Sequence, residues 1–164
     1  AVLGFHAELK EPDEVVVWSR IVETLSTVLD AEAATYYSYL QSKRQLLPRY
    51  ARGASAGDLK GTAVDIRTGL CGWVAGHREP LLLADAYKDD RFLREVDSVT
   101  GFRTQSVLAV PLMDRLELTG VIQLLNKRAG FFTSQDLRFV AAVCGSTSQV
   151  LRMLRLEGAA ARGS

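Results

Sequence analysis

The sequence predicts an α+β domain in which one antiparallel sheet of about six strands is covered on one face by helices from the two ends of the chain. Three observations predict it. Both ends carry long segments with helical hydrophobic spacing, the middle carries short runs rich in β-branched and aromatic residues, and strands do not alternate with helices. The loops of the middle segment are then expected to cover the other face of the sheet.

The first half of the chain is predicted to form a helix, a hairpin and an edge strand. The helix is expected to begin at Pro12, which is followed by two acids that suit a helix N-terminus. Its apolar face comprises Trp18, Ile21, Val22, Leu25, Val28 and Leu29. Residues 33–40 and 46–52 are predicted to form the hairpin, and residues 62–66 the edge strand after a glycine-rich loop.

The second half is predicted to form a short helix, three strands and a long helix. The short helix covers residues 69–79 and must end before Pro80. The three strands are residues 81–85, 106–112 and 120–126, the last two being strong apolar runs predicted to pair antiparallel. The long helix covers residues 132–157, and Thr133 or Ser134 is placed to cap its N-terminus.

Composition excludes several classes of partner. The 164 residues are 48% hydrophobic and 24% charged, which fits one domain with a sizeable core. The net charge is only +1 and neither sign forms a block, so nucleic acid is not expected as a partner. The apolar runs are shorter than the roughly 20 residues that span a bilayer, so we expect no membrane contact from this segment.

The two cysteines, Cys71 and Cys144, lie far apart in the sequence and form no CxxC pair. This pattern predicts neither a disulfide nor a metal site, and reduced thiols fit a cytoplasmic location. The first residue is not methionine and the last residues trail off without a clear stop, so we expect a segment of a longer protein. In it, residues 1–11 are a linker, residues 12–157 the domain, and residues 158–164 a tail.

Six segments in the second half of the chain follow one another in a characteristic order. They are GLCGWVAGHREP (69–80), LLADAYKDDRF (82–92), EVDSVTGFRT (95–104), VLAVPL (107–112), GVIQLLNK (120–127) and the F-x-x-x-D run (132–136). Together they resemble a GAF domain, of the branch found in cyclic-nucleotide phosphodiesterases and adenylyl cyclases. The resemblance covers about Pro12 to Leu154. It implies a regulatory sensing module in signal transduction and not an enzyme, with helices on one face of a six-stranded sheet and a small-molecule pocket on the other.

The hallmark motif of this branch is matched at Asn126, Lys127, Phe132 and Asp136. It is incomplete, because the next position is Leu137 where the branch has glutamate. Lys127 ends a predicted strand and Asp136 opens the last helix, so we expect an ion pair that clamps strand to helix. The motif is therefore interpreted as structural and does not identify a ligand.

The resemblance also implies a set of ligand-binding residues. They are Thr35, Leu70, Cys71, Asp97, Thr100, Thr104 and Gln123. Hydroxyls and backbone N–H groups suit a cyclic phosphate or sugar, and a carboxylate can accept from a ring N–H. Gln123 stands where cyclic-GMP-binding relatives can carry glutamate, and its neutral amide gives a less selective contact, so cyclic AMP and cyclic GMP are both candidate ligands. No cofactor is required.

The stretch from Glu95 to Ser106 also has a purely structural interpretation. Asp97 can cap a turn, Gly101 can end a helical turn, and Arg103 can pair with Asp97 or Glu95. On this interpretation the domain is a dimerisation or linker module with a vestigial pocket and no ligand.

Cys71 raises two chemical alternatives. A covalently attached bilin is disfavoured because its neighbours are Leu70 and Gly72, where photoreceptor GAF domains usually place a histidine. Reduction of methionine sulfoxide requires a low-pKa thiolate and a resolving partner, and Cys144 lies in the middle of the last helix. Both cysteines are expected to be small buried hydrophobes.

The last helix carries two apolar faces. One is formed by Leu137, Val140, Cys144, Thr147, Leu151 and Leu154, and the other by Phe139, Val143, Val150 and Met153. Only one face can lie on the sheet. The second face predicts a homodimer through the first and last helices, with the last helix continuing into an output domain.

Overall fold

The structure, a computed structural model, describes residues 2–53, 63–95, 97 and 101–163. Its sheet has six strands in the order β3-β2-β1-β6-β5-β4, and neighbouring strands pair antiparallel. The strands are β1 Ala31–Leu40, β2 Gln45–Arg52, β3 Val64–Asp65, β4 Leu81–Leu83, β5 Val107–Asp114 and β6 Glu117–Lys127. The helices are α1 Val2–Val28, α3 Gly69–His77, η1 Ala86–Lys88 and α5 Ser134–Gly163. The α+β fold with a six-stranded antiparallel sheet, predicted from the sequence, is confirmed.

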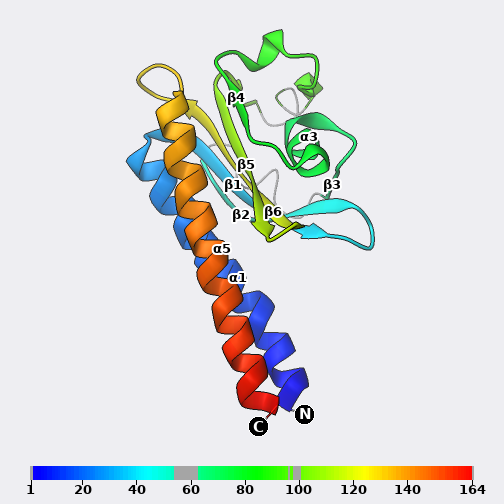
Figure 1. The fold of residues 1–164 in the computed structure, drawn as a ribbon. Helices are drawn as coiled ribbons and strands as arrows, with labels where there is room; N and C mark the ends of the chain where they lie inside the picture. The colour runs from blue at the N-terminus through cyan, green and yellow to red at the C-terminus, as the bar shows by residue number, and fades with distance from the viewer. Residues whose placement is uncertain (1, 54–62, 96, 98–100, 164) are drawn as a thin grey trace.

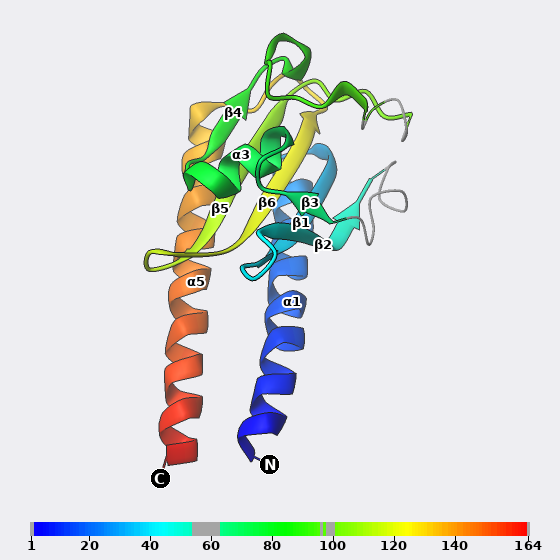
Figure 2. The same cartoon turned by 90° about the vertical axis from the view of Figure 1, so that its right-hand side faces the viewer.

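The elements form three layers. Helices α1 and α5 run side by side across one face of the sheet, and α3 lies against the other face (Figures 1 and 2). Both terminal helices extend beyond the sheet in the same direction, so the two ends of the chain lie together (Figure 1). Arg155 of α5 links the layers, because its guanidinium contacts Glu14 of α1 and Asp114 Oδ2 at 2.7 Å.

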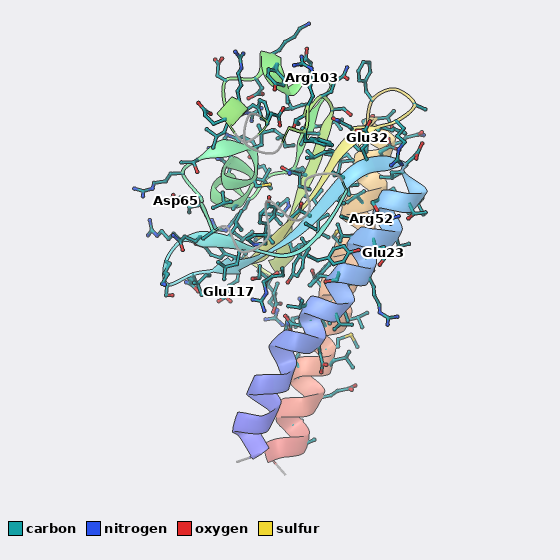
Figure 3. The ribbon with its side chains drawn as sticks, turned by 180° about the vertical axis from the view of Figure 1, so that it is seen from behind. Glu23, Glu32, Arg52, Asp65, Arg103 and Glu117 are labelled. Carbon is teal, nitrogen blue, oxygen red and sulfur yellow. The ribbon has the colours of Figure 1, made fainter. Side chains whose placement is uncertain are left out.

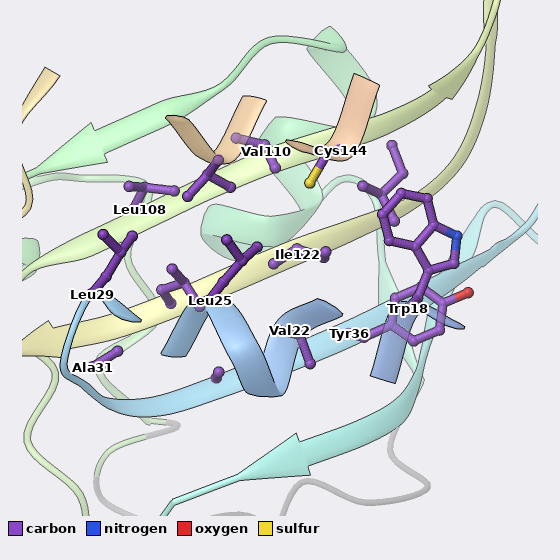
Figure 4. Packing of buried hydrophobic residues seen from close by; sticks show 14 of the residues in the cluster. Trp18, Val22, Leu25, Leu29, Ala31, Tyr36, Leu108, Val110, Ile122 and Cys144 are labelled. Atoms are coloured by element: carbon purple, nitrogen blue, oxygen red, sulfur yellow. The ribbon is translucent and has the colours of Figure 1, made fainter. Parts of the chain in front are cut away.

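The main core lies between the sheet and the terminal helices. Alternate residues of β5 and β6 point to this side, as the two-residue period of a strand requires. They pack against the apolar faces of α1 and α5, as Figure 4 shows. The buried members include Val22, Leu25, Leu108, Val110, Ile122, Leu124, Val140 and Cys144. Val28 was predicted on the buried face of the first helix and is 60% exposed, because it lies in the last turn, where α1 ends and the chain turns into β1.

Both terminal helices are longer than the sequence predicted. Helix α1 begins at Val2 and not at Pro12, so the segment predicted as a linker is helical over residues 2–11. A proline fixes a helical φ, so it suits a first turn and also fits within a helix at the cost of one backbone hydrogen bond. Helix α5 continues to Gly163, past the predicted end at residue 157.

The start of α5 carries the ion pair predicted from the sequence. Lys127 Nζ, at the end of β6, lies 2.8 Å from Asp136 Oδ2. Asp136 also forms a reciprocal cap with Thr133, since each backbone N–H donates to the other side chain, at 2.9 and 3.1 Å. One carboxylate thus fixes both the first turn of the helix and its attachment to the sheet.

Candidate functional site

The face of the sheet opposite the terminal helices carries polar side chains at its centre. Strand alternation places Thr35 and Tyr37 of β1 on this face, together with Gln123 of β6. Thr35 and Gln123 are directly paired across the two strands. All three side chains are buried. On the exposed face of a sheet, the side chains of Thr35 and Gln123 would be in contact with water.

Helix α3 covers these side chains. Gly72 lets the helix pass close to the end of β3, because a Cβ atom there would lie only 2.8 Å from the carbonyl oxygen of Asp65. Leu70 and Cys71 of this helix, both of which were predicted as site residues, are buried. Leu70 joins the apolar cluster of this face, whereas Cys71 meets the polar group on the sheet.

Four side chains form a continuous hydrogen-bonded group. The Cys71 thiol donates to Gln123 Oε1 at 2.8 Å. The Tyr37 hydroxyl hydrogen-bonds the thiol of Cys71, and the hydroxyl of Thr35 hydrogen-bonds Tyr37. We call Thr35, Tyr37, Cys71 and Gln123 the sheet group. Tyr37 was not among the site residues predicted from the sequence.

Burial sets the protonation states of the sheet group. It raises the pKa of Cys71 to about 12, and the hydrogen bond from Tyr37 opposes this only in part. Burial also raises the pKa of Tyr37 well above its ordinary value, with Cys71 adding to the effect. Both groups are therefore neutral at physiological pH. A neutral buried thiol is a poor nucleophile, which disfavours thiol chemistry at Cys71.

A second polar group lies in the loop that leads into β5. Asp97 is buried and accepts three hydrogen bonds. Thr104 supplies two of them, from its backbone N–H and its hydroxyl, both at 2.7 Å, and the Tyr87 hydroxyl supplies the third at 2.7 Å. We call Asp97, Thr104 and Tyr87 the loop group. Thr100, the remaining predicted ligand residue, lies outside the described residues.

Arginines flank the loop group. The guanidinium of Arg103 lies 4.3 Å from the centre of the Tyr87 ring, and that of Arg94 lies 5.4 Å from it. Arg94 also donates to the backbone oxygen of Tyr87 at 2.8 Å. Arg103 lies at the end of the sheet remote from the chain termini (Figure 3). It reaches Asp97 indirectly, because Tyr87 stands between them.

Asn126 connects the loop group to β6. Its side chain accepts from the backbone N–H of Gln105 at 2.6 Å and donates to the backbone oxygen of Arg103 at 2.8 Å, so it holds both neighbours of Thr104. Asn126 adopts a φ of 57°, a left-handed conformation that asparagine tolerates better than most residues. The sequence motif identified Asn126 but gave no sign of this contact, nor of the part played by Tyr87.

The predicted site residues thus fall into two places. Thr35, Cys71 and Gln123 are brought together in the sheet group, and Asp97 and Thr104 in the loop group. Strand β5 joins them, because it follows Thr104 after two residues and its Ala109 is paired with Gln123. Within the described part of the chain there is no cluster of side chains able to hold a metal ion. No helix among the same residues combines the length and apolar character needed to cross a membrane.

Comparison with known proteins identifies similar chains. A model of the GAF domain family matches residues 13–151. The chain is 30% identical over 154 residues to the "Probable 3',5'-cyclic phosphodiesterase pde-5" of Caenorhabditis elegans, a match that covers 86% of this chain and 21% of that protein. The chain therefore spans about a fifth of the length of this relative.

Solved structures share the fold. The GAF domain of a phosphoenolpyruvate-protein phosphotransferase from Coxiella burnetii superposes with a TM-score of 0.75 at 18% identity, covering 96% of this chain and 95% of that one. A type II free methionine-R-sulfoxide reductase from Thermoplasma acidophilum gives a TM-score of 0.71 at 15% identity, with coverages of 88% and 96%. At such identities the likeness shows a common architecture and carries no activity to this chain.

Proposed function

Because this chain belongs to the GAF domain family, we propose that it is a regulatory small-molecule-sensing module of a larger signalling protein and that its ligand is a cyclic nucleotide. The resemblance to the phosphodiesterase branch is confirmed by the similarity to a 3',5'-cyclic phosphodiesterase. GAF domains are regulatory or sensor domains, so any catalytic activity is assigned to another part of the parent protein.

The observation that supports a ligand is the sheet group. Burial of polar side chains opposes folding unless each finds a partner, so an apolar sheet face without a binding role has no need of them. Here a threonine, a tyrosine, a cysteine and a glutamine occupy one buried patch. Neutral donors of this kind suit the ring and sugar edges of a nucleotide, and the buried apolar side chains around them suit its faces.

The route from site to output is proposed to run through a homodimer. Helix α5 keeps an apolar stripe exposed, with Val150 at 54% and Met153 at 53%. Phe139 on the same stripe is also exposed, and α5 extends well beyond the sheet (Figure 1). A second copy packed on this stripe would form a helical bundle, from which the helix ends continue to an output domain.

Thermal unfolding tests the ligand proposal. We expect cyclic AMP or cyclic GMP to raise the melting temperature of the chain, since a ligand at 100 times its dissociation constant adds about 2.7 kcal/mol. The corresponding 5'-nucleotides serve as controls for nonspecific effects of phosphate and base. The absence of a shift with either cyclic nucleotide at millimolar concentration would contradict the proposal.

The alternative is a dimerisation or linker module without a ligand. One observation favours it: Asp97 and Thr104 hydrogen-bond each other, and Asp97 also accepts from Tyr87, so these groups already have partners within the chain.

Sedimentation tests the dimer separately. We expect the chain to be dimeric and Val150→Glu with Met153→Glu to make it monomeric, whereas Gln135→Glu, an exposed change on the same helix, leaves the dimer intact. A dimer without any cyclic-nucleotide shift would support the alternative.

A further inference from the structure

The side-chain amide of Gln123 has one end paired and one end free. Its oxygen accepts from Cys71, and the side chain is only 9% exposed. Among the residues that the structure describes, none accepts a hydrogen bond from its Nε2. A buried donor without a partner opposes folding, and native proteins keep few of them. The free amide nitrogen therefore calls for a partner from outside the described chain.

The thiol of Cys71 determines which end of the amide is free. It donates to Gln123 Oε1 at 2.8 Å. A thiol has a single proton to donate, and here the amide oxygen accepts that proton. The oxygen of the amide is therefore occupied, and the amide can present only its NH2.

We propose that Cys71 is a positioning residue that fixes the amide of Gln123, so that the site recognises a hydrogen-bond acceptor on the ligand ring, a ring nitrogen or a carbonyl oxygen. This inference rests on the proposed function and adds the chemistry of the recognised edge. A freely rotating amide accepts or donates equally well and gives no discrimination. An amide held by the thiol donates only.

The polarity of the amide can be reversed with little change in shape. In Gln123→Glu a carboxylate oxygen replaces the NH2, so the group facing the ligand becomes an acceptor and meets the ligand acceptor with repulsion. Gln123→Met keeps the length of the side chain and removes both polar ends, so it serves where the glutamate variant folds poorly. For cyclic AMP we expect a rise in Kd of at least about tenfold for the glutamate variant, and for whichever cyclic nucleotide binds tighter we expect a several-fold rise for the methionine variant.

The positioning role of Cys71 has its own test. Cys71→Ala removes the thiol donor and frees the amide, so the Kd is expected to rise several-fold, whereas Cys71→Ser keeps a donor and retains most of the affinity. In the Gln123→Met background, Cys71→Ala is expected to have no further effect, since the group on which it acts is gone. Cys144→Ala is the matched control, because Cys144 is the other buried cysteine and lies on the opposite side of the sheet.

The outcomes separate this inference from the proposed function. If the unmodified chain binds neither cyclic nucleotide, the proposed function fails and this inference fails with it. If the chain binds but both Gln123 variants bind as tightly, the function stands and the inference is overturned; an ordered water on Nε2 would give that result. If Cys71→Ala raised the Kd by the same factor in the unmodified chain and in the Gln123→Met background, the cysteine would be merely structural and its positioning role would be overturned.

Discussion

The two faces of the sheet are both buried, yet they are built from different chemistry. The face under α1 and α5 is covered by aliphatic side chains, such as those of Leu108, Ile122 and Leu124. The face under α3 has a comparable apolar rim, but its centre holds the four members of the sheet group. The same strands supply both faces, so the contrast is set residue by residue: along β6, Ile122 and Leu124 face the terminal helices and Gln123, between them, faces α3.

Under the proposed function, this contrast separates the face that stabilises the fold from the face that recognises the ligand. On the helix-covered face the buried aliphatic side chains stabilise the fold by leaving water. On the α3 face, burial of the Gln123 amide opposes folding because its NH2 is unpaired. A protein keeps such a group where it serves something other than folding. The four predictions below are arranged around this comparison, in order of decreasing expected effect.

The largest effect is expected from truncating the helix-covered face. Leu124→Ala should lower the free energy of unfolding by about 2–5 kcal/mol, because Leu124 is fully buried and leaves a cavity. Gln123→Met, at the adjacent position on the other face, should change the stability by no more than about 1 kcal/mol, since it removes an unpaired N–H group together with the oxygen that accepts from the weakly donating Cys71 thiol. Urea unfolding followed by circular dichroism measures both. Equal losses at the two positions would contradict the division between the faces.

A smaller loss is expected in the loop group. Thr104→Val removes one of three donors to the buried carboxylate of Asp97 and should cost about 1.5–3 kcal/mol, the range for hydrogen bonds to charged groups. Thr119→Val is the matched control, because its hydroxyl donates to a neutral backbone oxygen, that of Leu112, at 3.1 Å. Its cost should be about 0.5–1.5 kcal/mol by the same urea unfolding. A Thr104 loss no greater than that of Thr119 would show that Asp97 does not depend on this hydroxyl.

The ion pair at the start of α5 should give a smaller, pH-dependent loss. Burial alone would raise the pKa of Asp136, but hydrogen bonds from Lys127 and Thr133 outweigh it and hold the pKa below its ordinary value. The charged carboxylate therefore stabilises the fold above its unfolded-state pKa of about 3.9, and this contribution is lost as the pH falls through the lower folded-state value. Asp136→Asn should cost about 1–2 kcal/mol at pH 7 and progressively less below about pH 4.

The control for this prediction is a second ion pair. Asp30 and Arg128 pair at 2.8 Å, but both side chains are more than half exposed. Asp30→Asn should therefore change the stability by no more than about 1 kcal/mol at any of these pH values. If Asp136→Asn gave the same loss at pH 3 and pH 7, charge on Asp136 would not be the cause.

The smallest expected effect concerns the two cysteines, neither of which should react in the folded chain. Burial raises the pKa of Cys71 and of Cys144 to about 12, although they lie on opposite faces. Neither should be alkylated by iodoacetamide at pH 8 in the folded chain, and both should be alkylated in denaturing urea, as mass spectrometry would show. Both folded-state pKa values exceed the unfolded-state pKa of about 8.5. The stability that comes from keeping the two thiols neutral is therefore complete below that pH and declines as the pH rises above it. Alkylation of folded Cys71 would reopen thiol chemistry at this site.

The sequence predicted the features that depend on local pattern. The apolar runs of β5 and β6 and the spacing between Lys127 and Asp136 are visible in the chain itself, so the hairpin and the ion pair followed from them. The Cys71 to Gln123 hydrogen bond joins residues 52 positions apart and depends on how closely α3 approaches the sheet. The spacing of hydrophobic residues along the sequence does not indicate how closely two elements approach each other.

Other differences have equally local causes. The loop group depends on Tyr87, whose partner Asp97 is 10 positions away across a connection with little regular structure. Pro12 suggested a helix start because its restricted φ suits one, but the same restriction allows a place within α1. Val28 fits the spacing of a buried helix face. It is exposed because α1 ends at this residue, so the helical spacing does not continue beyond it.

Asn126 and Lys127 are consecutive residues with separate attachments. The first holds the backbone on both sides of Thr104, and the second holds the first turn of α5 through Asp136. The peptide bond between them is planar, so only the φ and ψ angles on either side of it and the two side chains can absorb a relative movement. The loop and the long helix are therefore anchored to adjacent residues at the end of one strand, and a displacement of either anchor is passed to the other through a single peptide unit.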